Sequence, residues 1–105
     1  MVYDGDEIKN IAAYELDKYM EQWKNQVLLI DVRDENKYRI EHIDNAINIP
    51  YKDILEKKTN IPKDKILVIY CDRGGLSMTV ARYLHKIGYR VVNVIGGLRN
   101  YRKKN

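Results

Sequence analysis

The sequence predicts an α/β fold built on a mostly parallel sheet. Apolar runs of strand length alternate along the chain with segments whose apolar residues recur at helical spacing, which is typical of this class. Two of the runs, residues 27–32 and 66–70, are almost continuously apolar, as expected of strands that are covered on both faces. With 105 residues, of which 45% are hydrophobic and 32% charged, the chain is expected to form one globular domain spanning residues 1–105.

Five short runs bounded by turn residues are predicted to be strands. They are residues 8–11, 27–32, 46–49, 66–70 and 91–95. Pro50 ends the third strand, because proline cannot donate to a sheet ladder. The turn 60–64 leads into the fourth strand, and Gly96 and Gly97 form a turn after the fifth.

Five helices are expected between and after these strands. They are residues 12–20, 35–41, 53–57, 77–87 and 98–102. The apolar face of the first is expected to hold Ala13, Leu16 and Met20, and that of the fourth Val80, Ala81, Leu84 and Ile87. Asp34 is the predicted N-cap of the second helix, and Gly88 the predicted C-cap of the fourth.

Charge and hydropathy argue against several classes of partner. The net charge is +4, and part of it lies in Arg99, Arg102, Lys103 and Lys104, where residues 102–105 form a basic tail. A short basic segment at a helix end complements the helix dipole, and no base-reading motif accompanies it, so we expect no nucleic-acid partner. No apolar run approaches the roughly 20 residues that span a bilayer. Residues 1–9 are acidic rather than signal-like, so we expect no membrane association and a cytoplasmic location.

The only cysteine, Cys71, directly follows the strand 66–70 and precedes two glycines and a helix. This order builds an anion-binding cradle around a sulfur atom, because Gly74 and Gly75 let backbone N–H groups point inward and the helix N-terminus points at the same place. A thiolate stabilised there is a nucleophile. The alternative is a buried cysteine that acts only as a small hydrophobic residue. With no second cysteine, neither a disulfide nor a zinc or thioredoxin-type site is expected, which fits a reducing compartment.

Three motifs stand in order along the chain. The first runs from Asp31-Val32-Arg33 through Tyr38 to the segment His42–Pro50; the second is the loop Cys71–Ser77; the third is the segment Gly96–Tyr101. With these motifs in this order, the chain resembles single-domain rhodaneses, a family of sulfurtransferases, over residues 8–101. The resemblance implies a rhodanese-like five-stranded parallel sheet with helices on both faces.

The resemblance also implies a two-step sulfur transfer without a cofactor or metal. The Cys71 thiolate would take a sulfane sulfur from a donor such as thiosulfate, become a persulfide, and pass the sulfur to cyanide, a thiol or an acceptor protein. A protein persulfide is an alternative donor. The substrate-binding residues would be those of the loop, namely Asp72, Arg73, Gly74, Gly75, Leu76 and Ser77. Arg73 is the cation expected to attract an anionic donor.

Departures from the family pattern bear on the substrate. Asp72 stands where many relatives carry a basic residue, and Leu76 where many carry arginine, so thiosulfate is expected to be a poor donor. Structural support is expected from Asp31 and Arg33, as a buried or half-buried ion pair, and from a hydrogen-bonded His42.

Two other functions are open alternatives. A cysteine phosphatase or arsenate reductase would need an arginine six positions after the nucleophile, where this chain has Ser77, and a longer loop. A non-catalytic interaction module is the second alternative, although such modules typically lack the cysteine that this chain retains.

Overall fold

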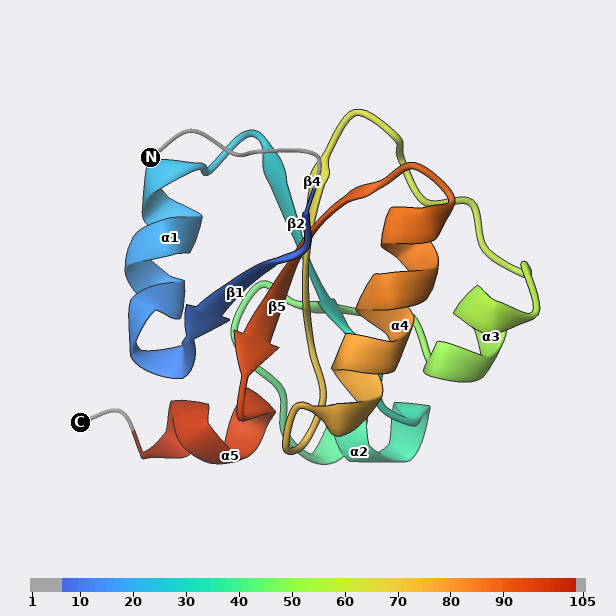
Figure 1. The fold of residues 1–105 in the computed structure, drawn as a ribbon. Coiled ribbons are helices and arrows are strands. Elements are labelled where there is room, and N and C mark those ends of the chain that lie inside the picture. The colour runs from blue at the N-terminus through green and yellow to red at the C-terminus, as the bar shows by residue number, and fades with distance from the viewer. Residues whose placement is uncertain (1–6, 104–105) are drawn as a thin grey trace.

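The structure is a computed structural model that describes residues 7–103, and its centre is a sheet of five parallel strands (Figure 1). The strands are β1 (Lys9–Ala12), β2 (Val27–Asp31), β3 (Ile47–Asn48), β4 (Ile66–Tyr70) and β5 (Arg90–Ile95). Their spatial order is β1-β5-β4-β2-β3, and every neighbouring pair is parallel. The predicted α/β class is confirmed, and the sheet is wholly rather than mostly parallel.

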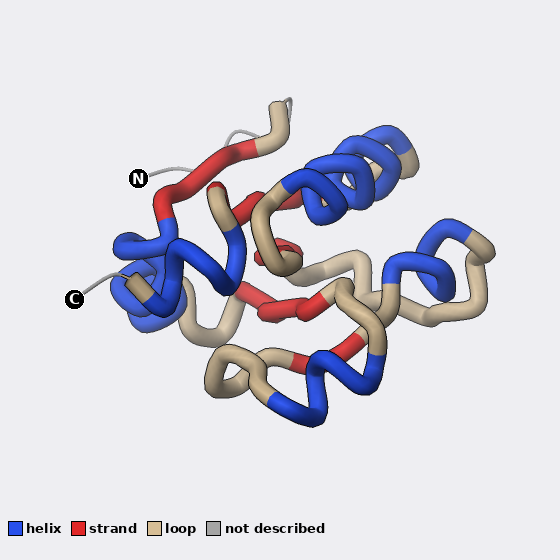
Figure 2. The backbone as a smooth tube through the Cα atoms, turned by 90° about the horizontal axis from the view of Figure 1, so that it is seen from below, coloured by secondary structure: helices blue, strands red, loops and turns tan. Residues whose placement is uncertain are grey.

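Helices cover both faces of this sheet (Figure 2). They are α1 (Leu16–Gln22), preceded by the 3-10 turn η1 (Ala13–Glu15), and α2 (Glu35–Ile40), α3 (Tyr51–Leu55), α4 (Gly75–Lys86) and α5 (Gly97–Arg102). In Figure 1, α1 lies on one side of the sheet and α3 and α4 lie on the other, while α2 and α5 lie near the end to which the strands β1 and β5 point.

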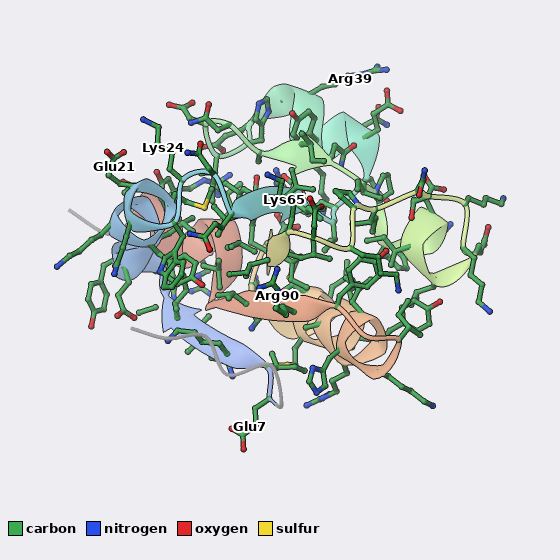
Figure 3. All side chains as sticks on the ribbon, turned by 90° about the horizontal axis from the view of Figure 1, so that it is seen from above. Glu7, Glu21, Lys24, Arg39, Lys65 and Arg90 are labelled. Atoms are coloured by element: carbon green, nitrogen blue, oxygen red, sulfur yellow. The ribbon has the colours of Figure 1, made fainter. Side chains whose placement is uncertain are left out.

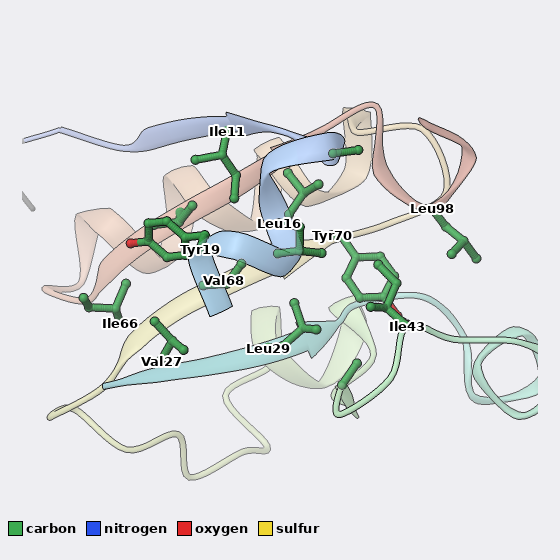
Figure 4. Packing of buried hydrophobic residues seen from close by; sticks show 14 residues of the cluster. Ile11, Leu16, Tyr19, Val27, Leu29, Ile43, Ile66, Val68, Tyr70 and Leu98 are labelled. Carbon is green, nitrogen blue, oxygen red and sulfur yellow. The ribbon is translucent and has the colours of Figure 1, made fainter. Parts of the chain in front are cut away.

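The core is divided into two clusters by the alternation of side chains along the strands. In the central strand β4, Ile66, Val68 and Tyr70 join the cluster under α1, which Figure 4 shows. Leu67 and Ile69 point to the other face, under α4. Cys71 continues this second series, so the period of two places its sulfur on the side of the sheet where α4 begins.

Several local predictions are corrected by the structure. The first helix, expected over 12–20, is α1 at Leu16–Gln22 after a 3-10 turn, and the third, expected over 53–57, is α3 at Tyr51–Leu55. Helix α4 begins at Gly75, two residues earlier than expected, because Gly74 adopts a left-handed conformation and serves as the N-cap. Asp34 occupies the N-cap position of α2, but its side chain makes no capping hydrogen bond. Ile87 lies beyond the last turn of α4 and is 42% exposed, so it does not extend the apolar face.

Charged side chains project from the periphery of the molecule (Figure 3). Arg102 of the predicted basic tail forms an ion pair with Glu41, whereas residues 104–105 lie outside the described part of the chain. Within residues 7–103, no helix is both long and apolar enough to cross a membrane.

Candidate active site

The sulfur of Cys71 lies in a turn of backbone N–H groups at the start of α4. The amide of Gly74 donates to Sγ at 3.1 Å, and the amide of Ser77 donates at 3.3 Å. Gly74 has a φ of 104°, a value that side chains with a Cβ rarely adopt, so the glycine permits this inward turn. The Cys71 residue is only 3% exposed. Two N–H donors and a helix N-terminus therefore face the sulfur and stabilise negative charge on it.

A chain of polar side chains leads from the sulfur through the buried Ser77 and Asn93 to the exposed Asn10 of β1. The Ser77 hydroxyl lies 3.5 Å from Cys71 Sγ and donates to Asn93 Oδ1 at 2.7 Å. Asn93 Nδ2 in turn donates to Asn10 Oδ1 at 3.1 Å. Asn93 lies in β5 and is 3% exposed, and it was not among the residues predicted for the site. The available signal was a single amide side chain within the otherwise apolar run 91–95.

The loop that carries the cysteine is held by the first turn of α5. The amide of Leu98 donates to the Cys71 carbonyl at 2.8 Å, and that of Arg99 donates to the Asp72 carbonyl at 2.9 Å. This contact requires a glycine at position 97, because a Cβ there would lie 2.2 Å from the Cys71 carbonyl oxygen. Cys71 and Gly96 thus share the rim formed by the carboxyl ends of the parallel strands β4 and β5, which are neighbours in the sheet.

The expected ion pair between Asp31 and Arg33 is present and buried. Arg33 Nη2 lies 2.7 Å from Asp31 Oδ2, and the two side chains are 5% and 0% exposed. Arg33 also donates to the Glu41 carbonyl at 2.6 Å. Tyr70, which sequence reasoning did not assign to the site, donates to Asp31 Oδ2 at 2.7 Å and accepts from the amide of Ile43. Burial is the main reason why the pKa of Tyr70 is raised, so its hydroxyl stays protonated at neutral pH.

Asp72 is not a free acidic group at the mouth of the site. Its carboxylate bridges two cations, with Oδ1 3.1 Å from Arg33 Nη1 and Oδ2 2.7 Å from Lys37 Nζ. Partial burial alone would raise the pKa of Asp72, but the hydrogen bonds from Lys37 and Arg33 outweigh it and the pKa is lowered. Lys37 is a second residue that sequence reasoning missed, because it lies 35 positions away in α2.

A cavity of about 350 Å³ opens onto the sulfur. Its lining residues are Arg33, Asp34, Lys37, Tyr51, Cys71, Asp72, Arg73, Gly75 and Leu76. Most of the expected loop residues therefore face one space, together with residues of α2 and α3. A larger cavity of about 600 Å³ lies beneath α1 and does not include the cysteine, so we take the smaller one as the candidate active site.

His42 lies apart from this cavity. Its ring is exposed and stacks on Tyr38 with centroids 3.8 Å apart, and Nδ1 lies 2.7 Å from the Tyr38 carbonyl oxygen. Tyr38 also donates to the Ala46 carbonyl at 2.6 Å. This arrangement agrees with the expected hydrogen-bonded histidine, which here supports the segment between α2 and β3.

The wholly parallel sheet and a cysteine loop at its carboxyl edge define an α/β protein whose buried thiol accepts two backbone hydrogen bonds. The chain belongs to the rhodanese-like domain family, whose sequence model matches residues 12–104. The thiosulfate sulfurtransferase GlpE of Coxiella burnetii is 32% identical over 97 residues, covering 91% of this chain and 86% of GlpE. The YtwF protein of Bacillus subtilis is 38% identical over 92 residues and covers 88% of each chain.

Solved structures agree with this assignment. A rhodanese-like domain protein from Staphylococcus aureus superimposes with a TM-score of 0.78 at 32% identity, covering 90% of this chain and 91% of that one. A rhodanese-related protein from Thermoplasma volcanium has the same TM-score of 0.78 at 25% identity, covering 92% and 93%. The predicted family and the rhodanese-like fold are confirmed.

Proposed function

We propose that this protein is a sulfurtransferase in which Cys71 carries the transferred sulfur as a persulfide. The proposal rests on one observation: the backbone N–H groups of Gly74 and Ser77 donate to the Sγ of Cys71, a residue that also lines a cavity of about 350 Å³. Membership of the rhodanese-like family supports the reaction class. A reducing compartment such as the cytoplasm would keep the single cysteine available as a thiol.

The first step with thiosulfate as donor is a displacement at sulfur. The Cys71 thiolate attacks the outer sulfur of thiosulfate, a new S–S bond forms, and the bond to the sulfonate sulfur breaks with its electron pair leaving on sulfite. The products are the Cys71 persulfide anion and sulfite, so charge and sulfur balance. The N–H groups of Gly74 and Ser77, which donate to Cys71 Sγ, would stabilise the anion. The reacting species is the thiolate, so the displacement itself transfers no proton.

The second step returns the enzyme to its starting state. An acceptor such as cyanide or a thiolate attacks the outer sulfur of the persulfide, and the S–S bond breaks with its electron pair returning to Cys71. With cyanide the product is thiocyanate. With a thiolate, from a small molecule or an acceptor protein, the product is a new persulfide. Neither step uses a cofactor or a metal ion.

The test is intact-mass spectrometry of the reduced protein after incubation with thiosulfate, with Cys71→Ser as the control. We expect the wild type to gain one sulfur atom, cyanide to remove it, and the serine variant to gain none. A gain only with a protein persulfide donor would identify a protein-fed carrier. No gain with either donor would reject the proposal and favour a non-catalytic interaction module.

A further inference from the structure

The most informative feature beyond the sulfur loop is the position of the Asp72 carboxylate. It lies between the guanidinium of Arg33 at 3.1 Å and the ammonium of Lys37 at 2.7 Å. All three residues line the cavity that contains Cys71. Two cations so arranged would bind an incoming anion, but here a carboxylate of the protein itself occupies the position between them.

The remaining positive charge in the cavity is small. Arg33 is also paired with Asp31, to which its Nε and Nη2 donate hydrogen bonds. Arg73 is the one lining cation without an ion-pair partner among residues 7–103, and the lining includes a second carboxylate, Asp34. The side-chain charges that line the cavity therefore sum to about +1, from three cations and two carboxylates.

We propose that Asp72 is a specificity-determining residue that disfavours doubly charged sulfur donors relative to singly charged ones. This inference rests on the proposed function and names the donor class of the same site. The carboxylate of Asp72 fills the anion position formed by Arg33 and Lys37, so a donor with two negative charges meets repulsion without gaining either cation as a partner.

The apolar residues that line the cavity are consistent with a donor that carries an organic group. Leu76 and Tyr51 both contribute to the lining of the cavity. Apolar side chains favour the body of an organic thiosulfonate or persulfide, because contact with them removes apolar surface from water. Such donors place one negative charge at the reacting sulfur, where the loop N–H groups lie.

The experiment compares two donors of similar size that differ by one charge. Thiosulfate is a dianion, and methanethiosulfonate replaces one of its charged oxygens with a methyl group. We would measure kcat/KM for both with the wild type, with Asp72→Asn and with Asp34→Asn as the matched charge control. We expect Asp72→Asn to raise the ratio of thiosulfate to methanethiosulfonate at least about fivefold, and Asp34→Asn to raise it by less than about twofold.

Two results would overturn the inference. An unchanged ratio in Asp72→Asn would mean that the carboxylate does not exclude the second charge. Equal shifts in the two variants would mean that net charge alone sets the preference, whichever carboxylate is removed.

A second readout does not depend on sulfur transfer. Cys71 is the only cysteine, so its alkylation by anionic iodoacetate and by neutral iodoacetamide can be followed by mass. Asp72→Asn should raise the rate ratio of iodoacetate to iodoacetamide at least about twofold, and more than Asp34→Asn does. If neither donor loads Cys71, the proposed function fails. The alkylation ratio then decides by itself whether Asp72 excludes negative charge from the cysteine.

Discussion

The amide of Leu98 donates a hydrogen bond of 2.8 Å to the carbonyl oxygen of Cys71, so the last helix of the domain holds the residue that we propose as nucleophile. The two residues are 27 positions apart in the sequence. The neighbouring bond, from the Arg99 amide to the Asp72 carbonyl, holds the next residue of the same loop. The direction of the Cys71 side chain therefore depends on the close approach of two backbone segments.

Gly97→Ala tests this close approach. The added Cβ would lie 2.2 Å from the Cys71 carbonyl oxygen, and φ is +58°, so we expect the loop to shift and sulfur loading of Cys71 to fall at least about a hundredfold. Gly88→Ala is the control, because Gly88 also has a positive φ but a Cβ there meets nothing within 4 Å. It should lose about 1 kcal/mol of unfolding free energy and keep its loading rate. Equal loading rates in the two variants would show that the contact is not needed.

Arg33→Met tests the buried ion pair. It leaves the carboxylate of Asp31 buried without its cation, so we expect the free energy of unfolding to fall by about 3 kcal/mol or more. Urea denaturation followed by circular dichroism measures this. Arg39→Met is the control, since Arg39 is 68% exposed and pairs only with Glu35 on the same helix, and it should change stability by less than about 0.5 kcal/mol. A loss in Arg33→Met as small as in the control would contradict the prediction.

Ser77→Ala distinguishes the contribution of the Ser77 hydroxyl to persulfide formation from that of the backbone N–H donors. Both N–H groups that reach Cys71 Sγ remain, so the rate of persulfide formation should fall by less than about tenfold. Asn93 Oδ1 loses its hydroxyl donor, at a stability cost of about 1 kcal/mol. Thr79→Ala, which removes an exposed hydroxyl from the same helix, should affect neither quantity. A loss of loading well beyond tenfold would mean that the two backbone N–H groups are not sufficient and that the hydroxyl is also needed for persulfide formation.

The pH dependence of donor choice follows from the Asp72 bridge. The pKa of the Asp72 carboxyl is lowered, and the pKa of Lys37 is raised, chiefly by its hydrogen bond to Asp72. The lowered carboxyl pKa means that this pairing stabilises the fold at neutral pH and is lost as the pH falls through that pKa. The raised ammonium pKa means that the pairing is lost at high pH, as the pH rises through that value. Both groups stay charged between these limits, so the ratio of kcat/KM for thiosulfate to that for methanethiosulfonate should be constant from about pH 6 to 9.

Lys37→Met provides the matching variant for this titration. Without the ammonium, the pKa of Asp72 should rise, because its strongest lowering influence is gone. Carbon-detected NMR of the Asp72 carboxyl across acidic pH measures the midpoint directly. A midpoint that does not move in Lys37→Met would mean that the bridge is not formed in solution.

The sequence alone determined the class of fold and the family, and it placed the cysteine that we propose as nucleophile directly after the fourth strand. A continuous apolar run of only five residues, bounded by a turn, is typical of a strand covered on both faces, and residues 66–70 were placed correctly at both ends. The period of two along a strand and the position of Cys71 just after β4 are local properties of the chain. The glycines after the cysteine likewise predict a tight turn before a helix, because their conformational freedom is local.

Only the tertiary structure decided which distant groups act on the loop. Lys37 and Asn93 reach the site from α2 and β5, and no local pattern pairs them with Asp72 or Ser77. In the sequence, Asp72 is only an acidic residue in the cysteine loop, but the fold places its carboxylate between two cations. The physical reason is that ion pairs and hydrogen bonds depend on the distance between groups in space. The strand order β1-β5-β4-β2-β3 fixes those distances, and the order of residues along the sequence does not reveal them.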